Sequence, residues 1–210
     1  MFVRSVMIPL RKTISVTESK TAKEVLSLLE KHNIDGVPVI TDGRYAGIVT
    51  RYKIYEAQFA SGMSAEDFLE YMKAGDMAHW LLDTVTEDAV FEQTLLLVKD
   101  RPLIAVTGQK GELLGIITRS DILEQFQSAF GMKAKGVRIS FTSVETEGRI
   151  ARLSEITRQF HENIISLATF DESDKLVRRI VMKVEKKQSM DKFLKKLEQS
   201  GFRILSIHED

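Results

Sequence analysis

The start of the chain alternates between a helical and an extended hydrophobic pattern. Thr21 and Glu24 have the spacing of a capping box, and apolar residues then recur every three or four positions. This helix face consists of Ala22, Val25, Leu26 and Leu29. The apolar, β-branched run Ile34–Ile40 predicts a buried strand, and Tyr45–Thr50 predicts its partner beyond a turn that contains glycine. A second helix is expected over Arg51–Phe59.

The same pattern occurs a second time. Residues 47–53 (GIVTRYK) recur at 115–121 as GIITRSD, 68 residues later, and two further blocks recur at offsets of 69 and 67 residues. The second copy predicts helices over Ala89–Lys99 and Ser120–Phe130, with strands over Leu103–Val106 and Leu113–Thr118 between them. Both copies have the order β-α-β-β-α, and the near-constant offsets indicate an internal duplication.

A different pattern begins after the second copy. Gly131–Gly136 has two glycines and no apolar periodicity, which is typical of a linker. The order βαββαβ then follows, predicted over residues 137–144, 150–161, 164–170, 176–184, 190–200 and 202–208. Such an order packs a four-stranded sheet against two helices, as in ferredoxin-like folds.

The fold class is therefore α/β (α+β), with four parts. We expect a first repeat at 1–60, a second repeat at 61–130 that includes a connecting helix starting at Ser64, the linker at 131–136, and a C-terminal domain at 137–210.

Composition narrows the function. The 210 residues carry 30 Lys+Arg and 30 Asp+Glu, and this balance favours neither nucleic acid nor a membrane as a partner. The chain has no cysteine, and its 4 histidines lack metal-ligand spacing, so we expect no metal site. No nucleophile elbow or phosphate-binding loop is present, which indicates a protein that is not an enzyme. Without a signal peptide or a long apolar run, the expected localisation is cytoplasmic.

The duplicated part resembles tandem cystathionine β-synthase (CBS) domains, the pair known as a Bateman module. The resemblance covers about residues 1–130 and depends most on the signature Gly-apolar-x-Thr-x-x-Asp, which is intact at Gly115, Thr118 and Asp121. It implies no cofactor but a regulatory ligand that contains adenosine: AMP, ADP, ATP, S-adenosylmethionine, reduced nicotinamide dinucleotide or cyclic di-AMP. The family's ribose and phosphate positions match Thr118, Arg119, Ser120 and Asp121. Its base positions match Ile14, Ile34, Asp35, Gly36 and Pro38.

The first repeat departs from this signature, because Lys53 stands where the ribose-binding Asp is expected. An ammonium group cannot accept hydrogen bonds from ribose hydroxyls. Lys53 is then either a solvated lysine in a cleft that binds no ligand, or a cation that binds the phosphate of a ligand in the other cleft. We expect one functional site per chain.

The C-terminal segment resembles an ACT domain, a small ligand-binding and dimerising unit. Residues 145–150 (ETEGRI) stand where that family has Asp-x-x-Gly-x-Leu, with Glu145 in place of Asp and Gly148 at the loop that approaches a bound amino acid. Residues 161–166 (HENIIS) resemble its Asn-Ile strand entry. The domain either binds an amino acid or has a purely structural role.

Proteins of similar organisation include bacterial acetoin-utilisation-type and cyclic di-AMP-binding CBS/ACT regulators. The resemblance implies a non-enzymatic regulatory sensor that binds an adenosine-containing nucleotide in the CBS cleft. It would transmit its state to the ACT dimer or to an unidentified protein partner. Both modules favour a homodimer. The alternative is a structural adaptor or dimerisation protein without ligand binding, and the intact signature at residues 118–121 counts against it.

Overall fold

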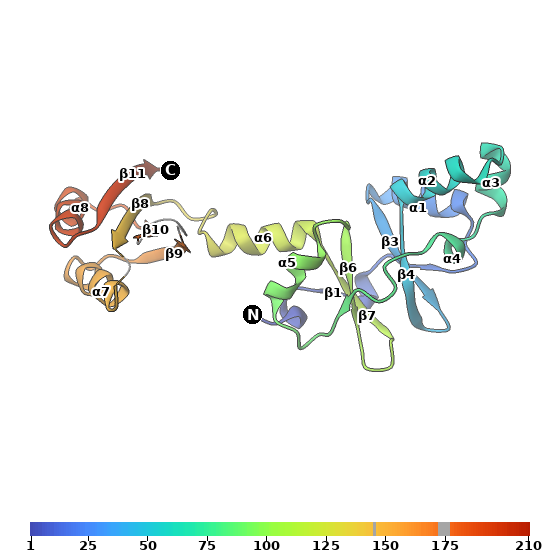
Figure 1. The fold of residues 1–210 in the computed structure, drawn as a ribbon, viewed down its shortest axis with the longest axis horizontal. Coiled ribbons are helices and arrows are strands. Elements are labelled where there is room, and N and C mark those ends of the chain that lie inside the picture. Colours follow the sequence, from blue (N-terminus) through green and yellow to red (C-terminus); the bar gives the residue numbers. More distant parts are fainter. Residues whose placement is uncertain (145, 172–176) are drawn as a thin grey trace. The chain divides into compact units, whose positions relative to one another are not determined.

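The computed structural model describes residues 1–144, 146–171 and 177–210. The chain forms two compact units, Met1–Leu123 and Glu124–Asp210 (Figure 1). The boundary between them falls inside helix α6 (Arg119–Ala129). Within the described ranges, no helix combines the length and apolar content that a membrane span requires.

The first unit contains both repeats except for the end of α6, and each repeat has the predicted order β-α-β-β-α. The first repeat consists of β2 (Val16–Thr17), α1 (Ala22–His32), β3 (Gly36–Thr41), β4 (Arg44–Thr50) and α2 (Arg51–Ser61). The second consists of β5 (Thr84–Val85), the 3-10 helix η3 (Phe91–Gln93), α5 (Thr94–Leu97), β6 (Leu103–Thr107), β7 (Leu113–Thr118) and α6. The remaining elements are η1 (Val3–Ser5), β1 (Ile8–Pro9), η2 (Leu10–Lys12), α3 (Ala65–Tyr71) and α4 (Ala74–Met77).

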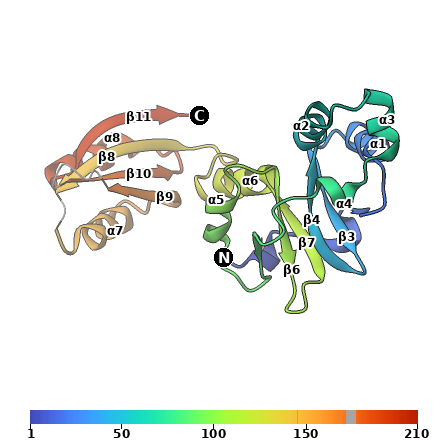
Figure 2. The same cartoon turned by 45° about the vertical axis from the view of Figure 1, so that its right-hand side comes forward.

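The first repeat forms as its local sequence predicts. The Thr21 hydroxyl accepts a hydrogen bond from the Glu24 N–H at 3.2 Å, and the Glu24 carboxylate accepts one from the Thr21 N–H at 2.8 Å, so the capping box starts α1. Asp42 and Gly43 have φ angles of 50° and 76°, as a tight turn between β3 and β4 requires. Helices α1, α2 and α3 gather at the end of this hairpin opposite its turn (Figures 1 and 2).

Each repeat receives a strand-like segment from the chain that precedes the other repeat. Ile8 in β1 pairs with Ile116 in β7, and His79, which precedes the second repeat, pairs with Ile48 in β4. The signature glycines allow this approach. A Cβ atom on Gly115 would lie 2.3 Å from the Ile8 carbonyl oxygen, and one on Gly47 would lie 2.9 Å from that of His79. The signature glycine is therefore needed for packing in both repeats.

The two repeats share an apolar interface. Its buried residues are Tyr45, Ile48, Leu103, Ala105, Leu113 and Ile116, with Ile8, Ile40 and Trp80 packed against them. The Tyr45 hydroxyl, whose pKa burial raises, donates a hydrogen bond to the Trp80 carbonyl oxygen at 3.0 Å. This interface holds the two repeats together.

The predicted helix over Ala89–Lys99 is wrong in length. The segment forms only η3 and the single turn of α5. Val90 occupies the N-cap position that Thr21 occupies in the first repeat, and no side chain caps this start. Pro102 then restricts the backbone of the residue before it. Without a cap at one end and with Pro102 beyond the other, the helix is shorter than α1.

The second unit has the predicted order βαββαβ. It consists of β8 (Val137–Val144), α7 (Arg149–Gln159), β9 (Ile164–Asp171), β10 (Val177–Val184), α8 (Met190–Gln199) and β11 (Arg203–Glu209). All neighbouring strands are antiparallel in the order β11-β8-β10-β9, which is a ferredoxin-like sheet. Leu153 and Ile156 of α7, with Phe193 and Leu197 of α8, form one core with the sheet. Glu145 and the first residue of the predicted strand 176–184 lie outside the described residues.

Candidate functional site

A cavity of about 330 Å³ lies in the first unit where the two repeats meet. This volume is at the lower end of the range for small-molecule sites. Seven of the nine residues that the sequence singled out line it: Ile14, Ile34, Asp35, Gly36, Thr118, Arg119 and Ser120. The structure therefore brings together the segments that the sequence placed on opposite sides of one cleft.

Backbone hydrogen bonds fix the wall that comes from the first repeat. Asn33 ends α1 in the left-handed conformation, with φ at 50°, and turns the chain toward the cavity. The Ile34 N–H donates to the Leu29 carbonyl at 3.0 Å, and the Arg51 N–H donates to the Asp35 carbonyl at 3.0 Å. The segment between α1 and β3 is thus held at both ends, and this wall is preformed.

The wall from the second repeat is the start of α6. The Asp121 Oδ2 atom accepts hydrogen bonds from the Thr118 N–H at 2.8 Å and from the Thr118 hydroxyl at 2.6 Å. The Asp121 N–H donates back to the Thr118 hydroxyl at 3.2 Å, so the two residues form a reciprocal cap. In the described part of the chain, Oδ1 of Asp121 makes no hydrogen bond, which leaves one carboxylate oxygen for a ligand.

Three predicted site residues differ in how they relate to the cavity. The Arg119 guanidinium donates to the carbonyls of Val98 at 3.2 Å and Lys99 at 3.0 Å, so it braces the start of α6. Asp121 and the buried Pro38 of β3 do not line the cavity in the described part of the chain. Asp121 holds Thr118 at the edge of the cavity through a hydrogen bond, whereas Pro38 lies opposite Ile48 within the sheet.

A second cavity of about 460 Å³ lies in the cleft of the first repeat's signature. It is lined by Asp35, Thr50, Arg51, Tyr52, Tyr55, Trp80, Asp100, Pro102 and Arg119. Lys53 does not line it, because its Nζ atom lies 2.5 Å from the Glu56 carboxylate on the same helix. This hydrogen bond lowers the pKa of Glu56. The pairing favours the interpretation in which Lys53 binds no ligand.

The sequence did not single out several residues of the first cavity. They are Ile8, Lys12, Thr13, Asn33, Pro102, Leu103 and Ile116. The duplication itself offered a signal for two of them, since Pro102 and Leu103 stand 67 residues after Asp35 and Gly36. Lys12 adds a cation at the rim that no motif marks.

In the second unit, Gly148 is the glycine that the ACT resemblance assigned to a ligand-approaching loop. It precedes α7 with φ at 79° and lines a cavity of about 510 Å³ with Thr146, Glu147 and Arg149. The Arg149 side chain is already bound: it donates to the Ser143 hydroxyl at 2.5 Å and to the Gly201 carbonyl at 2.9 Å. Glu145, the counterpart of the family's Asp, lies outside the described residues. The bound guanidinium favours a structural role for Arg149 over contact with an amino acid.

Comparisons with known proteins agree with the fold of the first unit. An inosine-5'-monophosphate dehydrogenase of Korarchaeum cryptofilum is 24% identical over 177 residues, covering 75% of this chain. The match spans only 34% of that enzyme, so the chain corresponds to about a third of it.

Solved structures give the same result. CbpB in complex with c-di-AMP has a TM-score of 0.53 at 22% identity, covering 61% of this chain and 85% of that one. CBSX2 in complex with AMP has a TM-score of 0.51 at 26% identity, covering 60% and 95%. A hypothetical conserved protein from Geobacillus kaustophilus has a TM-score of 0.55 at 23% identity, covering 60% and 96%.

The family model described as the CBS domain matches twice. The matched ranges are residues 3–60 and 82–128, which make up half of the chain. These ranges coincide with the two β-α-β-β-α repeats that form the candidate site. The chain belongs to the CBS-domain family.

Proposed function

We propose that the protein is a non-enzymatic regulatory sensor that binds an adenosine-containing nucleotide in the cavity between its repeats. The observation that carries this proposal is the convergence of seven sequence-selected residues from both repeats on one preformed cavity. Structures similar to the first unit include complexes of CbpB with c-di-AMP and of CBSX2 with AMP. AMP, ADP, ATP and cyclic di-AMP are the ligands to test first.

The residues of the cavity suit the parts of a nucleotide. Beside the cavity, Oδ1 of Asp121 would accept a hydroxyl of a ribose that extends past Thr118, and within the cavity the Ser120 hydroxyl can bind phosphate. The Arg119 and Asp121 N–H groups already donate to the Pro102 carbonyl and the Thr118 hydroxyl. Lys12 at the rim adds positive charge. Ile8, Ile14 and Ile34 supply an apolar surface for the base, which orients the adenine toward the first repeat.

The rest of the chain fits a regulator. We propose that the second unit is an ACT-like domain, which its strand order supports, and that the protein is a cytoplasmic homodimer. Tyr52, Tyr55 and Phe59 on one face of α2 are exposed by 70%, 52% and 90%, and such an aromatic stripe suits contact with a second copy. An unidentified protein partner would receive the signal. The chain matches about a third of the dehydrogenase relative, too little of that enzyme to imply its activity.

Calorimetry with AMP on the full chain tests the site. Asp121→Asn keeps an acceptor for the Thr118 N–H but removes the charge, and losing a charge-assisted bond should weaken binding about 10- to 100-fold. The matched control is Lys53→Asn at the same position of the first repeat, which should bind as the wild type does. Wild-type affinity in a folded Asp121→Asn protein would contradict the site.

A ligand screen distinguishes a nucleotide sensor from a structural adaptor that binds no ligand. A nucleotide at 100 times its dissociation constant should stabilise the folded chain by about 2.7 kcal/mol, which a thermal shift detects. If AMP, ADP, ATP, S-adenosylmethionine, reduced nicotinamide dinucleotide and cyclic di-AMP all leave the unfolding temperature unchanged, the adaptor alternative is favoured. Light scattering on the same samples should give the mass of a dimer.

A further inference from the structure

A row of polar side chains crosses the second unit on the face of the sheet that α7 and α8 leave uncovered. Strand pairing places Ser166 opposite Lys183, Lys183 opposite Arg138, and Arg138 opposite His208. Directly opposite residues project from the same face of a sheet. The neighbours of Arg138 and Lys183 along their strands, Ile139 and Met182, belong to the core beneath the helices. The row therefore lies on the opposite face, across all four strands.

Like charges directly opposite one another destabilise a sheet, so a row with two permanent cations requires an anion. Lys183 makes this requirement stronger because its side chain is only 6% exposed. Its ammonium group donates to the Gly131 carbonyl at 3.2 Å and pairs with the Asp210 carboxylate. The other oxygen of that carboxylate lies 3.5 Å from the His208 ring. A carboxylate is thus the group that this row holds.

The electrostatics of Asp210 agree with this description. The hydrogen bond from Lys183 lowers the pKa of Asp210, and the positive charges of Lys183, His208 and Arg138 act in the same direction. Asp210 follows the last residue of β11 and is 40% exposed at its side chain. Its backbone N–H donates to the Gly136 carbonyl at 3.2 Å, so the movement that would free the row is that of its side chain alone.

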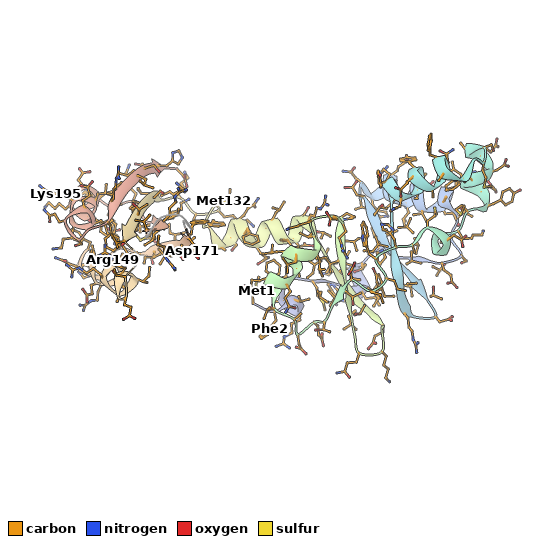
Figure 3. All side chains as sticks on the ribbon, viewed as in Figure 1. Met1, Phe2, Met132, Arg149, Asp171 and Lys195 are labelled. Atoms are coloured by element: carbon orange, nitrogen blue, oxygen red, sulfur yellow. The ribbon has the colours of Figure 1, made fainter. Side chains whose placement is uncertain are left out.

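A cavity that is partly apolar and partly charged adjoins the row. Its volume is about 530 Å³, and its apolar lining consists of Phe130, Met132, Ala134, Phe170 and Val181. Lys133, Lys135, Arg138, Ser166, Lys183 and Asp210 complete the lining. The turn that carries Phe130 is anchored to the same face, because the Ser166 hydroxyl donates to the Phe130 carbonyl at 3.0 Å. In Figure 3, Met132 and Lys195 lie on opposite sides of the second unit.

We propose that this cavity is a second ligand site, for a small organic acid whose carboxylate takes the place of Asp210 on Lys183, with Arg138 beside it on the same face. The apolar body of the acid would lie against Phe130, Met132 and Phe170. Asp210 would then act as an intramolecular competitor that fills the site when the acid is absent. The proposal lies beyond the nucleotide function and involves no residue of the first unit, so each can fail without the other.

Hexanoate is a suitable probe, and hexanamide is its uncharged counterpart of the same shape. Titration of the full chain, followed by calorimetry, should show binding of hexanoate and at least about tenfold weaker binding of hexanamide, since one charge-assisted bond contributes that much. Asp210→Asn should bind hexanoate about tenfold more tightly, because the competing charge is removed. Lys183→Met should abolish binding.

The matched control is Lys195→Met on α8, an exposed lysine away from the row, which should bind hexanoate as the wild type does. If Lys183→Met does not fold, the exposed Arg138→Gln carries the same test and should weaken binding about tenfold. Equal binding of hexanoate and hexanamide would overturn the proposal. So would unchanged hexanoate affinity in Asp210→Asn, which would make that residue a structural partner of Lys183 only.

Discussion

The first repeat carries Lys53 where the second carries Asp121, and this pair of residues separates two clefts that are otherwise built alike. In both, a threonine before the helix accepts a hydrogen bond from the N–H three residues later, at 3.1 Å for Lys53 and 3.2 Å for Asp121. Only the second repeat adds a carboxylate to this cap. The first repeat therefore keeps the backbone conformation of the cleft although it lacks the residue that would bind ribose.

A second difference concerns the segments that the repeats exchange. Ile8 pairs with β7 of the second repeat, whereas His79 occupies the corresponding place beside β4 of the first. An apolar residue suits this interface, and a histidine there is a departure from the pattern. The comparison teaches that duplication preserves the glycine that permits the exchange, while the side chains on either side of it are free to diverge.

The largest effect is expected where the exchanged segments approach the signature glycines. Gly115→Ala should lower the free energy of unfolding by about 3 kcal/mol, because its Cβ would lie 2.3 Å from a backbone oxygen that cannot move alone. Denaturant unfolding followed by the fluorescence of Trp80, the single tryptophan, measures this in the first unit.

Gly111→Ala provides the matched control for this loss of stability. Gly111 has a positive φ, at 79°, which Gly115 does not have, but nothing lies within 4 Å of its Cβ position, so backbone strain alone should cost about 1 kcal/mol. The pseudo-equivalent Gly47→Ala should resemble Gly115→Ala. Equal costs for Gly115→Ala and Gly111→Ala would show that the Ile8 segment simply moves away.

The next effect concerns ligand stoichiometry. Lys53→Asp restores the family carboxylate in the first repeat, whose cavity of about 460 Å³ has room for a ligand. We expect AMP binding to rise from one to two per chain, with the new carboxylate contributing on the order of 1.5 to 3 kcal/mol per bond. Calorimetry measures the stoichiometry. An unchanged value of one would mean that Tyr52, which stands where Ser120 stands in the other repeat, closes the cleft to nucleotides.

Sequence reasoning succeeded where a local interaction determines the structure. The Thr21–Glu24 box started α1 as expected, and seven of the nine selected residues, Thr118 of the signature among them, line one cavity because each lies at a fixed place in a repeated unit. It failed where a local signal was missing. The N-cap of the first helix in the second repeat is Val90, which cannot cap it, so the apolar periodicity over residues 89–99 predicted a longer helix than the chain forms.

Long-range pairing explains the other gaps. Strand β1 has only two residues and pairs with β7 more than one hundred positions away, so no periodicity marks it. Lys12 and Ile8 reach the cavity through this pairing. The ion pair between Asp210 and Lys183 was equally unpredictable from the sequence. Only the register of three strands brings Lys183, Arg138 and His208 side by side.

The smallest effect concerns His79, the residue that breaks the likeness between the exchanged segments. Neither ring nitrogen makes a hydrogen bond of good geometry in the described part of the chain, and both atoms are buried. Burial lowers the pKa of His79 below its ordinary value of 6.5, against smaller opposing effects of the Met77 and Ile48 carbonyls. The unfolded chain therefore binds a proton at a higher pH than the folded chain, and the wild type should lose stability as the pH falls through about 6.5.

His79→Ile, which copies Ile8, should raise the free energy of unfolding by about 1 kcal/mol at pH 7 and flatten its decline toward pH 5. The reverse change, Ile8→His, should lower stability and steepen that decline. Denaturant unfolding between pH 5 and 8 is the measurement, and an unchanged slope in His79→Ile would mean that the imidazole finds a partner when it is protonated.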